Sequence, residues 1–486
     1  MSTVKGSGLS LNPGSSRPVA PKPASSWNPG AAEIRGTRLI FLGYLALLTV
    51  EYTGLANQIP ALKAMRFSTV MNYLLLLLIV PRIRFAEIAG SIQFRLLAGF
   101  LFLTALGLLH ADVQTYVFTS LRPMAESIVF MLLTMYVLDR RSRLETFMLV
   151  LAAVAAVLVA RNFHRLGAST RVGSFAAPYF MGDGNDFAWA MIVILPIALA
   201  LVLVQRKTIP KLVGLGAAVA CVLGIVGTQS RGATLGLAAA AMYGWWFVAK
   251  RRLLGAVAVV VLAIGVVVVA PAGYFSRMQT VAEYEEDNSA QARLQAWGAA
   301  IRMAVNRPLG VGAGNFNSAY GRYYNDPNGR VGWGAARWIS AHSIYFKVLG
   351  EYGFVGAAML LWLIGASIRD NFVFRRLLRT SQGAPLDEQW PAFLNMSIIG
   401  FAVAGAFLTG FNYPHLFLLS GLTLSIGRII RLEYQGTVTT VASSAGHFGI
   451  APALVRNQGS TLALHSARSR VPPAGVRPVR RPQKPK

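Results

Sequence analysis

The chain has 486 residues, of which 54% are hydrophobic, with a mean hydropathy of +0.50 and a formal net charge of +27. Apolar runs recur at the roughly 20-residue length that crosses a bilayer, which excludes a soluble globular protein and predicts a polytopic membrane protein. The positive charge would suggest nucleic acid in a soluble protein. Here it lies mainly in loops and in the C-terminal tail, so we expect no nucleic-acid partner.

In chain order, the apolar runs predict an all-α membrane protein of about twelve transmembrane helices, because lipid cannot hydrogen-bond an open backbone. The expected spans are residues 38–55, 62–80, 96–109, 117–138, 147–160, 187–204, 212–226, 233–249 and 253–270, then 344–368, 393–409 and 416–430. The domain boundaries that follow are 1–37, 38–270, 271–341, 342–431 and 432–486.

The two terminal segments differ from the rest in composition. Residues 1–37 are rich in Pro, Ser and Gly and hold no apolar core of a cleavable signal, so the first span should direct insertion. Residues 432–486 are basic and rich in Pro, Ser, Ala and Gly. We expect both to be disordered cytoplasmic tails, and the second is basic enough to rest on anionic membrane lipids.

Basic residues set the orientation of the spans. They cluster in alternate loops, as the positive-inside rule requires of the cytoplasmic face. The clusters are Arg82 with Arg84, residues 140–143, Arg206-Lys207, residues 250–252, Arg375-Arg376 and Arg428. The connections at residues 161–186, 227–232, 271–341 and 412–415 are then external, and Lys63 and Arg66 are the main exceptions.

The long external segment, residues 271–341, contains seven arginines and no lysine. A guanidinium fork matches phosphate or carboxylate oxygens better than an ammonium group does, so the bias indicates recognition of such an anion. The alternative is that a long loop crosses the membrane regardless of its charge, and that these arginines are solvated surface.

The sequence favours a site without a metal or other cofactor. The six histidines are dispersed, no His-x-x-x-His, Glu-x-x-His or Asp-x-Asp pattern occurs, and Cys221 is the only cysteine. Cationic side chains would then have to neutralise any phosphate on the substrate.

Three external features are candidates for that task. Arg231 follows Ser230 in a glycine-flanked break between two spans, Arg293 and Trp297 share one face of an expected helix, and His342 begins a span. Taken singly, each has a simpler explanation: an interfacial anchor for the first and third, and an amphipathic surface helix for the second. Topology places all of them on one side at one depth, which favours a shared site.

These segments, in this order, resemble the core of the O-antigen ligase and polymerase superfamily. The resemblance rests on residues 227–233, Arg293 with Trp297, residues 306–316 and residues 341–356. Two further features are similar to the O-glycosylation ligases and polysaccharide polymerases of exosortase systems. They are residues 277–280 with Asp287 and residues 289–290, and the His-Ser-Ile-Tyr-Phe form of the last motif.

The resemblance implies a C-type glycosyltransferase with a helical periplasmic loop between the ninth and tenth spans, in the bacterial inner membrane. Its donor would be a glycan on undecaprenyl diphosphate, and its acceptor a glycan, the lipid A core or a glycoprotein. Arg231 and Arg293 would bind and stabilise the leaving diphosphate, and His342 would be the general base in an inverting transfer.

Other external residues are weaker candidates for substrate contacts. They are Arg171, Ser230, Trp297, Arg322 and Arg337 for phosphate or sugar, and Tyr320, Tyr323, Tyr324, Trp333 and Trp338 for stacking on sugar rings. The tyrosines and tryptophans equally fit an interfacial belt, and Asn185-Asp186 fits a helix cap.

A secondary transporter is the alternative class, because about twelve spans with basic inner loops suit it too. Two matching halves are not evident, and few ionisable residues lie mid-span, Glu126 being the clearest. A flippase for the same lipid-linked sugar would need a large charged cavity. The choice between ligase and polymerase stays open, since both use the same donor chemistry.

Overall fold

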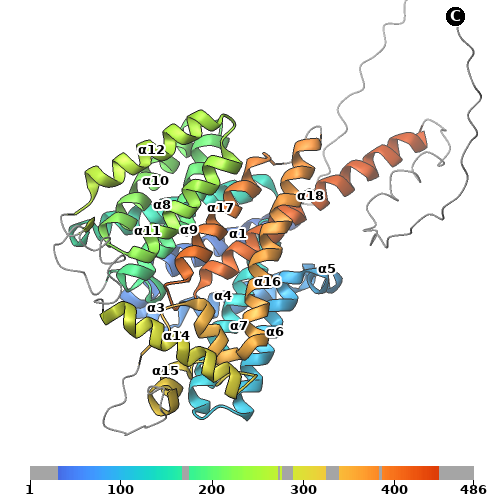
Figure 1. Ribbon diagram of the computed structural model, residues 1–486. Coiled ribbons are helices and arrows are strands. Elements are labelled where there is room, and N and C mark those ends of the chain that lie inside the picture. The colour runs from blue at the N-terminus through green and yellow to red at the C-terminus, as the bar shows by residue number, and fades with distance from the viewer. Residues whose placement is uncertain are drawn as a thin grey trace, which may run out of the picture. The chain divides into compact units, whose positions relative to one another are not determined.

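The computed structural model of the chain describes residues 31–166, 175–271, 274–275, 288–324, 339–381 and 386–447. Within these ranges every regular element is helical (Figure 1). The longer helices are α1 (Ala31–Thr53), α4 (Phe67–Ile79), α6 (Ile92–Leu106), α7 (Gln114–Val137), α8 (Arg141–Arg161), α9 (Gly184–Val204), α10 (Thr208–Gly227), α11 (Arg231–Tyr243), α12 (Arg252–Val269), α14 (Asn288–Asn306), α16 (Ile344–Thr380), α17 (Gln389–Gly405) and α18 (Pro414–His447).

Short helical pieces join them. They are α2 (Leu55–Gln58), α3 (Pro60–Ala64), α5 (Phe85–Gly90), α15 (Phe316–Ala319), the tight turns η1 (Val80–Arg82), η2 (Gly107–Leu109), η3 (Phe163–Arg165) and η4 (Tyr179–Met181), and the π-helical turns η5 (Gly244–Val248) and η6 (Tyr320–Tyr324).

Eight helices of the described chain are long and apolar enough to cross a membrane. They are Ile92–Leu109, Gln114–Val137, Arg141–Arg161, Gly184–Val204, Thr208–Gly227, Arg252–Val269, Ile344–Thr380 and Pro414–Glu433. Each coincides with one predicted span, which confirms a polytopic helical membrane protein. The other four predicted spans fall on α1, α4, α11 and α17, of which the last three have 13, 13 and 17 residues.

Residues of the segments predicted to be external contact one another, the 110–116 connection and the end of the span at 393–409. The Tyr413 hydroxyl donates to Asp186 Oδ2 at 2.8 Å, and Arg307 Nη1 lies 3.1 Å from Asp112 Oδ1. The Ser340 hydroxyl donates to Thr409 Oγ1 at 3.3 Å. Loops far apart in sequence are therefore gathered at one end of the helices.

Segments predicted to be cytoplasmic likewise meet. Arg375 donates to the Phe247 carbonyl oxygen at 2.6 Å, and Arg428 Nε lies 3.5 Å from Glu87 Oε1. The Ser425 hydroxyl donates to a carbonyl at the end of α7. The grouping of loops by charge in the sequence therefore matches their grouping in space.

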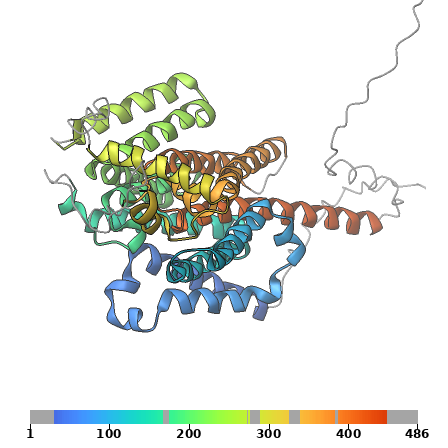
Figure 2. The ribbon, with the colours of Figure 1, turned by 60° about the horizontal axis from the view of Figure 1, so that its bottom comes forward.

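The first of two compact units ends at Ile429, and helices α16 and α17 belong to it. Helix α6 packs on α16, α16 packs on α17, and α17 packs on α9 and α11. In Figure 2, α16 and α17 (orange) lie between the N-terminal helices (blue) and α10 to α12 (green). Small residues permit this approach, since a Cβ on Gly236 of α11 would lie 2.8 Å from Ala404 Cβ of α17.

Helix α16 is broken near its start. Gly353 has φ 66° and ψ −165°, a combination open essentially to glycine alone. The break leaves two carbonyl oxygens of the preceding turn available to another segment: Val311 N donates to Gly350 O at 2.9 Å, and Gly312 N donates to Glu351 O at 3.0 Å. The glycine-rich loop before α15 is thereby tied to α16. The predicted span ended at residue 368, whereas α16 continues to Thr380.

The C-terminal helix is also longer than predicted. The last span was expected to end at residue 430, but α18 continues to His447. The first proline after the start of α18 is Pro452. Every residue between them therefore has the N–H group that a helical hydrogen bond needs.

The segment between α12 and α16 has a small core of its own. Alanines and Met303 of α14 pack with Phe316, Tyr320 and Tyr324 against Ala341. Tyr320 and Tyr324 are 0% and 7% exposed, so the expectation that they stack on sugar is wrong: their rings fill this core. Tyr323 is exposed, and Trp333 and Trp338 lie outside the described residues.

Candidate functional site

Arg231 is the first residue of α11. The Ser230 hydroxyl accepts a hydrogen bond from Ala233 N at 3.4 Å and so caps the helix. The sequence suggested that glycines make this break, but Gln229 takes the left-handed conformation, with φ 54°. Gly232 serves close packing instead, because a Cβ there would lie 2.7 Å from Phe407 Cβ.

His342 is exposed and precedes α16, with φ 46°. Both neighbours are buried: the Ala341 carbonyl accepts the Trp297 indole N–H at 2.9 Å, and Ser343 is the N-terminal cap residue of α16. Such a backbone conformation costs a non-glycine residue about 1–3 kcal/mol and persists only where its surroundings impose it. The buried residues on both sides therefore hold the backbone of His342 in place.

Arg293 and Trp297 lie on α14, which confirms the helix expected around them. Trp297 stacks on Phe346 of α16, with ring centroids 4.8 Å apart and planes 10° from parallel. Arg293 is half-buried one turn before Trp297. The indole thus joins the helix that carries Arg293 to the segment that carries His342.

A series of contacts joins the start of α11 to the residues that precede α16. Gly232 packs on Phe407, two residues before Thr409, whose hydroxyl oxygen accepts from Ser340. Ser340 stands two residues before His342. The segments that carry Arg231, Arg293 and His342 therefore converge, although they come from α11, α14 and the start of α16.

The weaker candidates have different outcomes. Ser230 is buried as a helix cap, and Arg322 is half-buried in η6. Arg171, Arg337, residues 277–280 and Asp287 lie outside the described residues. Asn185-Asp186 was expected to cap α9, but Asp183 is the cap: its carboxylate accepts from Asn185 N at 2.8 Å.

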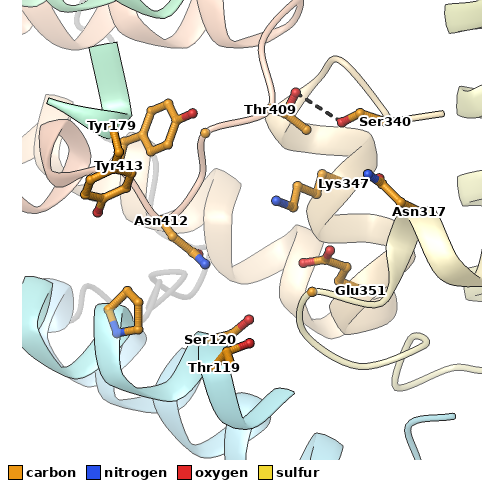
Figure 3. Close-up of a pocket in the computed structure, with 13 residues that line it drawn as sticks. Thr119, Ser120, Tyr179, Asn317, Ser340, Lys347, Glu351, Thr409, Asn412 and Tyr413 are labelled. Atoms are coloured by element: carbon orange, nitrogen blue, oxygen red, sulfur yellow. Dashed lines mark hydrogen bonds between the residues drawn. The ribbon is translucent and has the colours of Figure 1, made fainter. Parts of the chain in front are cut away.

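A cavity of about 320 Å³ has Ser340 and Thr409 in its wall (Figure 3). Six parts of the chain line it: α7, η4, the segment from Gly314 to α15, Ser340, α16, and residues 409–413 between α17 and α18. Its polar side chains include hydroxyls, amides and two opposite charges. The main ones are Thr119, Ser120, Asn317, Lys347, Glu351 and Asn412.

Lys347 and Glu351 lie four residues apart on α16 and line this cavity. Glu351 is only 3% exposed, and its carboxylate accepts from Phe316 N at 3.4 Å. Neither was singled out from the sequence. Two opposite charges one turn apart inside an apolar span were the available signal, because ionisable residues within spans are rare and mark functional sites.

Tyr413 closes one side of the cavity. Burial and the adjacent Asp186 carboxylate raise the pKa of its phenol above the usual value. The phenol therefore stays protonated and donates to Asp186 Oδ2. Within the described ranges, no three His, Cys, Asp or Glu side chains group as metal ligands would.

Comparison with known protein families gives one match in this region. Residues 216–361 match the family model described as O-antigen ligase, a stretch that runs from α10 through Arg231, α14 and His342 to the broken helix α16. A search among proteins of curated function found no match. Residues 216–361 are thus similar to the O-antigen ligases, an enzyme family, and they lie within a multi-pass membrane protein.

Proposed function

We propose that the protein is a metal-independent, inverting glycosyltransferase that moves a glycan from undecaprenyl diphosphate to an acceptor hydroxyl at the periplasmic face of the bacterial inner membrane. The observation that supports this most is the convergence of the segments carrying Arg231, Arg293 and His342 inside the matched domain.

In the proposed reaction, the acceptor oxygen attacks the anomeric carbon while the bond from that carbon to the diphosphate oxygen breaks. His342 takes the acceptor proton, and undecaprenyl diphosphate leaves with the electron pair. One displacement inverts the anomeric centre. A positioned base contributes about 10²–10⁴-fold to such a rate.

Arg231 and Arg293 would stabilise the charge that builds on the leaving diphosphate. Fixed guanidinium groups at a water-poor boundary favour the transition state because they need no reorganisation as the charge develops. Trp297 and Ser230 would hold these groups in place. Arg322, with Arg171 and Arg337, would add contacts to phosphate or sugar.

The membrane arrangement we propose has twelve crossings. Helices α1, α4, α11 and α17 would join the eight longer ones, with residues 271–341 in the periplasm and both tails in the cytoplasm. The loops that meet at each end of the helices support the assignment of these loops to two opposite faces, and the basic residues give the orientation.

The acceptor defines the biological role. A ligase would transfer a finished glycan to the lipid A core or to a glycoprotein, and a polymerase would transfer it to the next lipid-linked repeat. The resemblance to exosortase-associated enzymes favours exopolysaccharide assembly.

Transfer in proteoliposomes tests the proposal. The wild type, with undecaprenyl diphosphate-linked donor and EDTA present, should form product, whereas His342→Ala, Arg231→Ala and Arg293→Ala should not. A ladder of products would identify a polymerase, and a single shifted band a ligase. His164→Ala and Arg95→Ala are matched controls, because both side chains are exposed and lie outside the proposed site. Full activity of His342→Ala would overturn the assigned roles.

A further inference from the structure

The chemistry of the cavity, whose wall includes Ser340 two residues before His342, suits a hydroxyl-rich ligand. Thr119 and Ser120 present hydroxyls from α7, and Asn317 and Asn412 present amides from opposite sides (Figure 3). The two hydroxyls donate to Tyr116 O, at 3.0 and 2.7 Å, and so keep acceptor lone pairs for a ligand. The two amides both donate and accept hydrogen bonds, as the hydroxyl groups of a sugar ring do. Such convergent polar groups fix the orientation of a ligand in a cavity.

The two charged side chains add a directional element. Lys347 and Glu351 point into the cavity from the same face of α16 (Figure 3). A lysine ammonium only donates hydrogen bonds, and an ionised carboxylate only accepts them. The pair therefore distinguishes ring hydroxyls by position.

The cavity is placed at the reacting end of the site. The hydrogen-bonded hydroxyls of Ser340 and Thr409 lie along its wall, and Ser340 is two residues from His342. Lys347 lies in the first turn of α16, which begins two residues after His342. A ring held here would lie near the groups that exchange the proton.

The size limits what can enter. About 320 Å³ is at the lower end of the range of about 300–1,000 Å³ for ligand pockets. The exposure of Gly314 and Asn317 on the wall leaves the cavity open to the outside. It suits one terminal sugar ring of a longer glycan, with the remainder extending outward.

We propose that this cavity is a sugar-binding subsite in which Lys347 and Glu351 hold hydroxyl groups of one ring of the donor or the acceptor. The proposal rests on the glycosyl transfer proposed above and adds specificity-determining residues to it.

Ligand-observed NMR tests this without relying on transfer. The probes are methyl glycosides of common hexoses and N-acetylhexosamines, added to the protein in nanodiscs with saturation transferred from the protein. At least one glycoside should receive saturation at its ring protons, and Lys347→Met or Asn317→Ala should abolish it. Lys63→Met and Asn57→Ala are matched controls on exposed residues and should retain it. No transfer to any glycoside, equal signals in all variants, or displacement of the glycoside by inorganic diphosphate would overturn the proposal.

Steady-state kinetics then separate the two sources of the ring. Loss of a hydrogen bond to a charged group should raise one KM about tenfold or more in Lys347→Met. A subsite that binds ground and transition states equally leaves kcat unchanged. A raised KM for the donor assigns the ring to the donor glycan, and a raised KM for the acceptor assigns it to the acceptor. If the wild type transfers glycan and both KM values stay at the wild-type level, the subsite is refuted while the proposed function stands.

Discussion

The break in α16 can be tested with a pair of glycines in the same helix. A Cβ on Gly353 would lie 1.8 Å from Pro308 O and 2.6 Å from Pro308 C. For alanine, the backbone conformation alone costs about 1–3 kcal/mol, and rotation of a side chain cannot relieve a clash with a carbonyl group. Gly353→Ala should therefore separate the glycine-rich loop from α16 and lower stability by more than that amount.

Gly365 provides the control, because a Cβ there meets no atom within 4 Å. Alanine in a helix interior is more stable than glycine by about 0.5–1 kcal/mol, so Gly365→Ala should raise the apparent unfolding temperature slightly. Both substitutions replace glycine with alanine, and we expect them to change the stability in opposite directions.

Purified variants in one detergent, heated at one scan rate, give the comparison, followed by initial rates of glycan transfer. Because the start of α16 follows His342 directly, a shift of about 1 Å there could cost about 10²-fold in rate. Wild-type melting and activity of Gly353→Ala would refute the argument that the break ties the loop to the site.

Three further outcomes are expected. Trp297→Phe should preserve stacking on Phe346 but lose the hydrogen bond to Ala341 O. We expect it to lower the free energy of unfolding by about 1 kcal/mol and to reduce kcat by more than that energy alone corresponds to. A kcat equal to that of the wild type would contradict this. Tyr413→Phe removes the donor to Asp186 and should cost about 1.5–3 kcal/mol in unfolding measurements; an unchanged unfolding curve would show that the bond contributes nothing. EDTA should leave the transfer rate unchanged, and a loss restored by a divalent cation would contradict a metal-independent reaction.

Much of the helical framework could be predicted from hydrophobic runs and charged loops. These signals are local, and the eight long helices follow them. Helix α14 was also predictable, since Arg293 and Trp297 fall on one face of a helical repeat. The break at Gly353 was not, because an isolated glycine is compatible with an apolar helix. The Pro308 carbonyl, which packs where a Cβ on Gly353 would lie, comes from another segment and has no signal in the local sequence.

The cavity could not be predicted because it depends on packing between distant segments. Thr119 from α7 and Asn412 from the α17–α18 connection have no shared pattern in the sequence. The burial of Tyr320 was missed for a related reason: an aromatic residue near a membrane fits an interface, a ligand or a core equally well until its neighbours are known. Lys347 and Glu351 did carry a signal, as opposite charges within a span.

The most direct measurement is the release of undecaprenyl diphosphate by the purified wild-type protein in nanodiscs, followed together with glycan transfer and the anomeric configuration of the product. The proposed function predicts one undecaprenyl diphosphate released for each glycan transferred, an inverted linkage, and neither product with His342→Ala. Release at the wild-type rate by His342→Ala, or no release by the wild type with any acceptor offered, would contradict it.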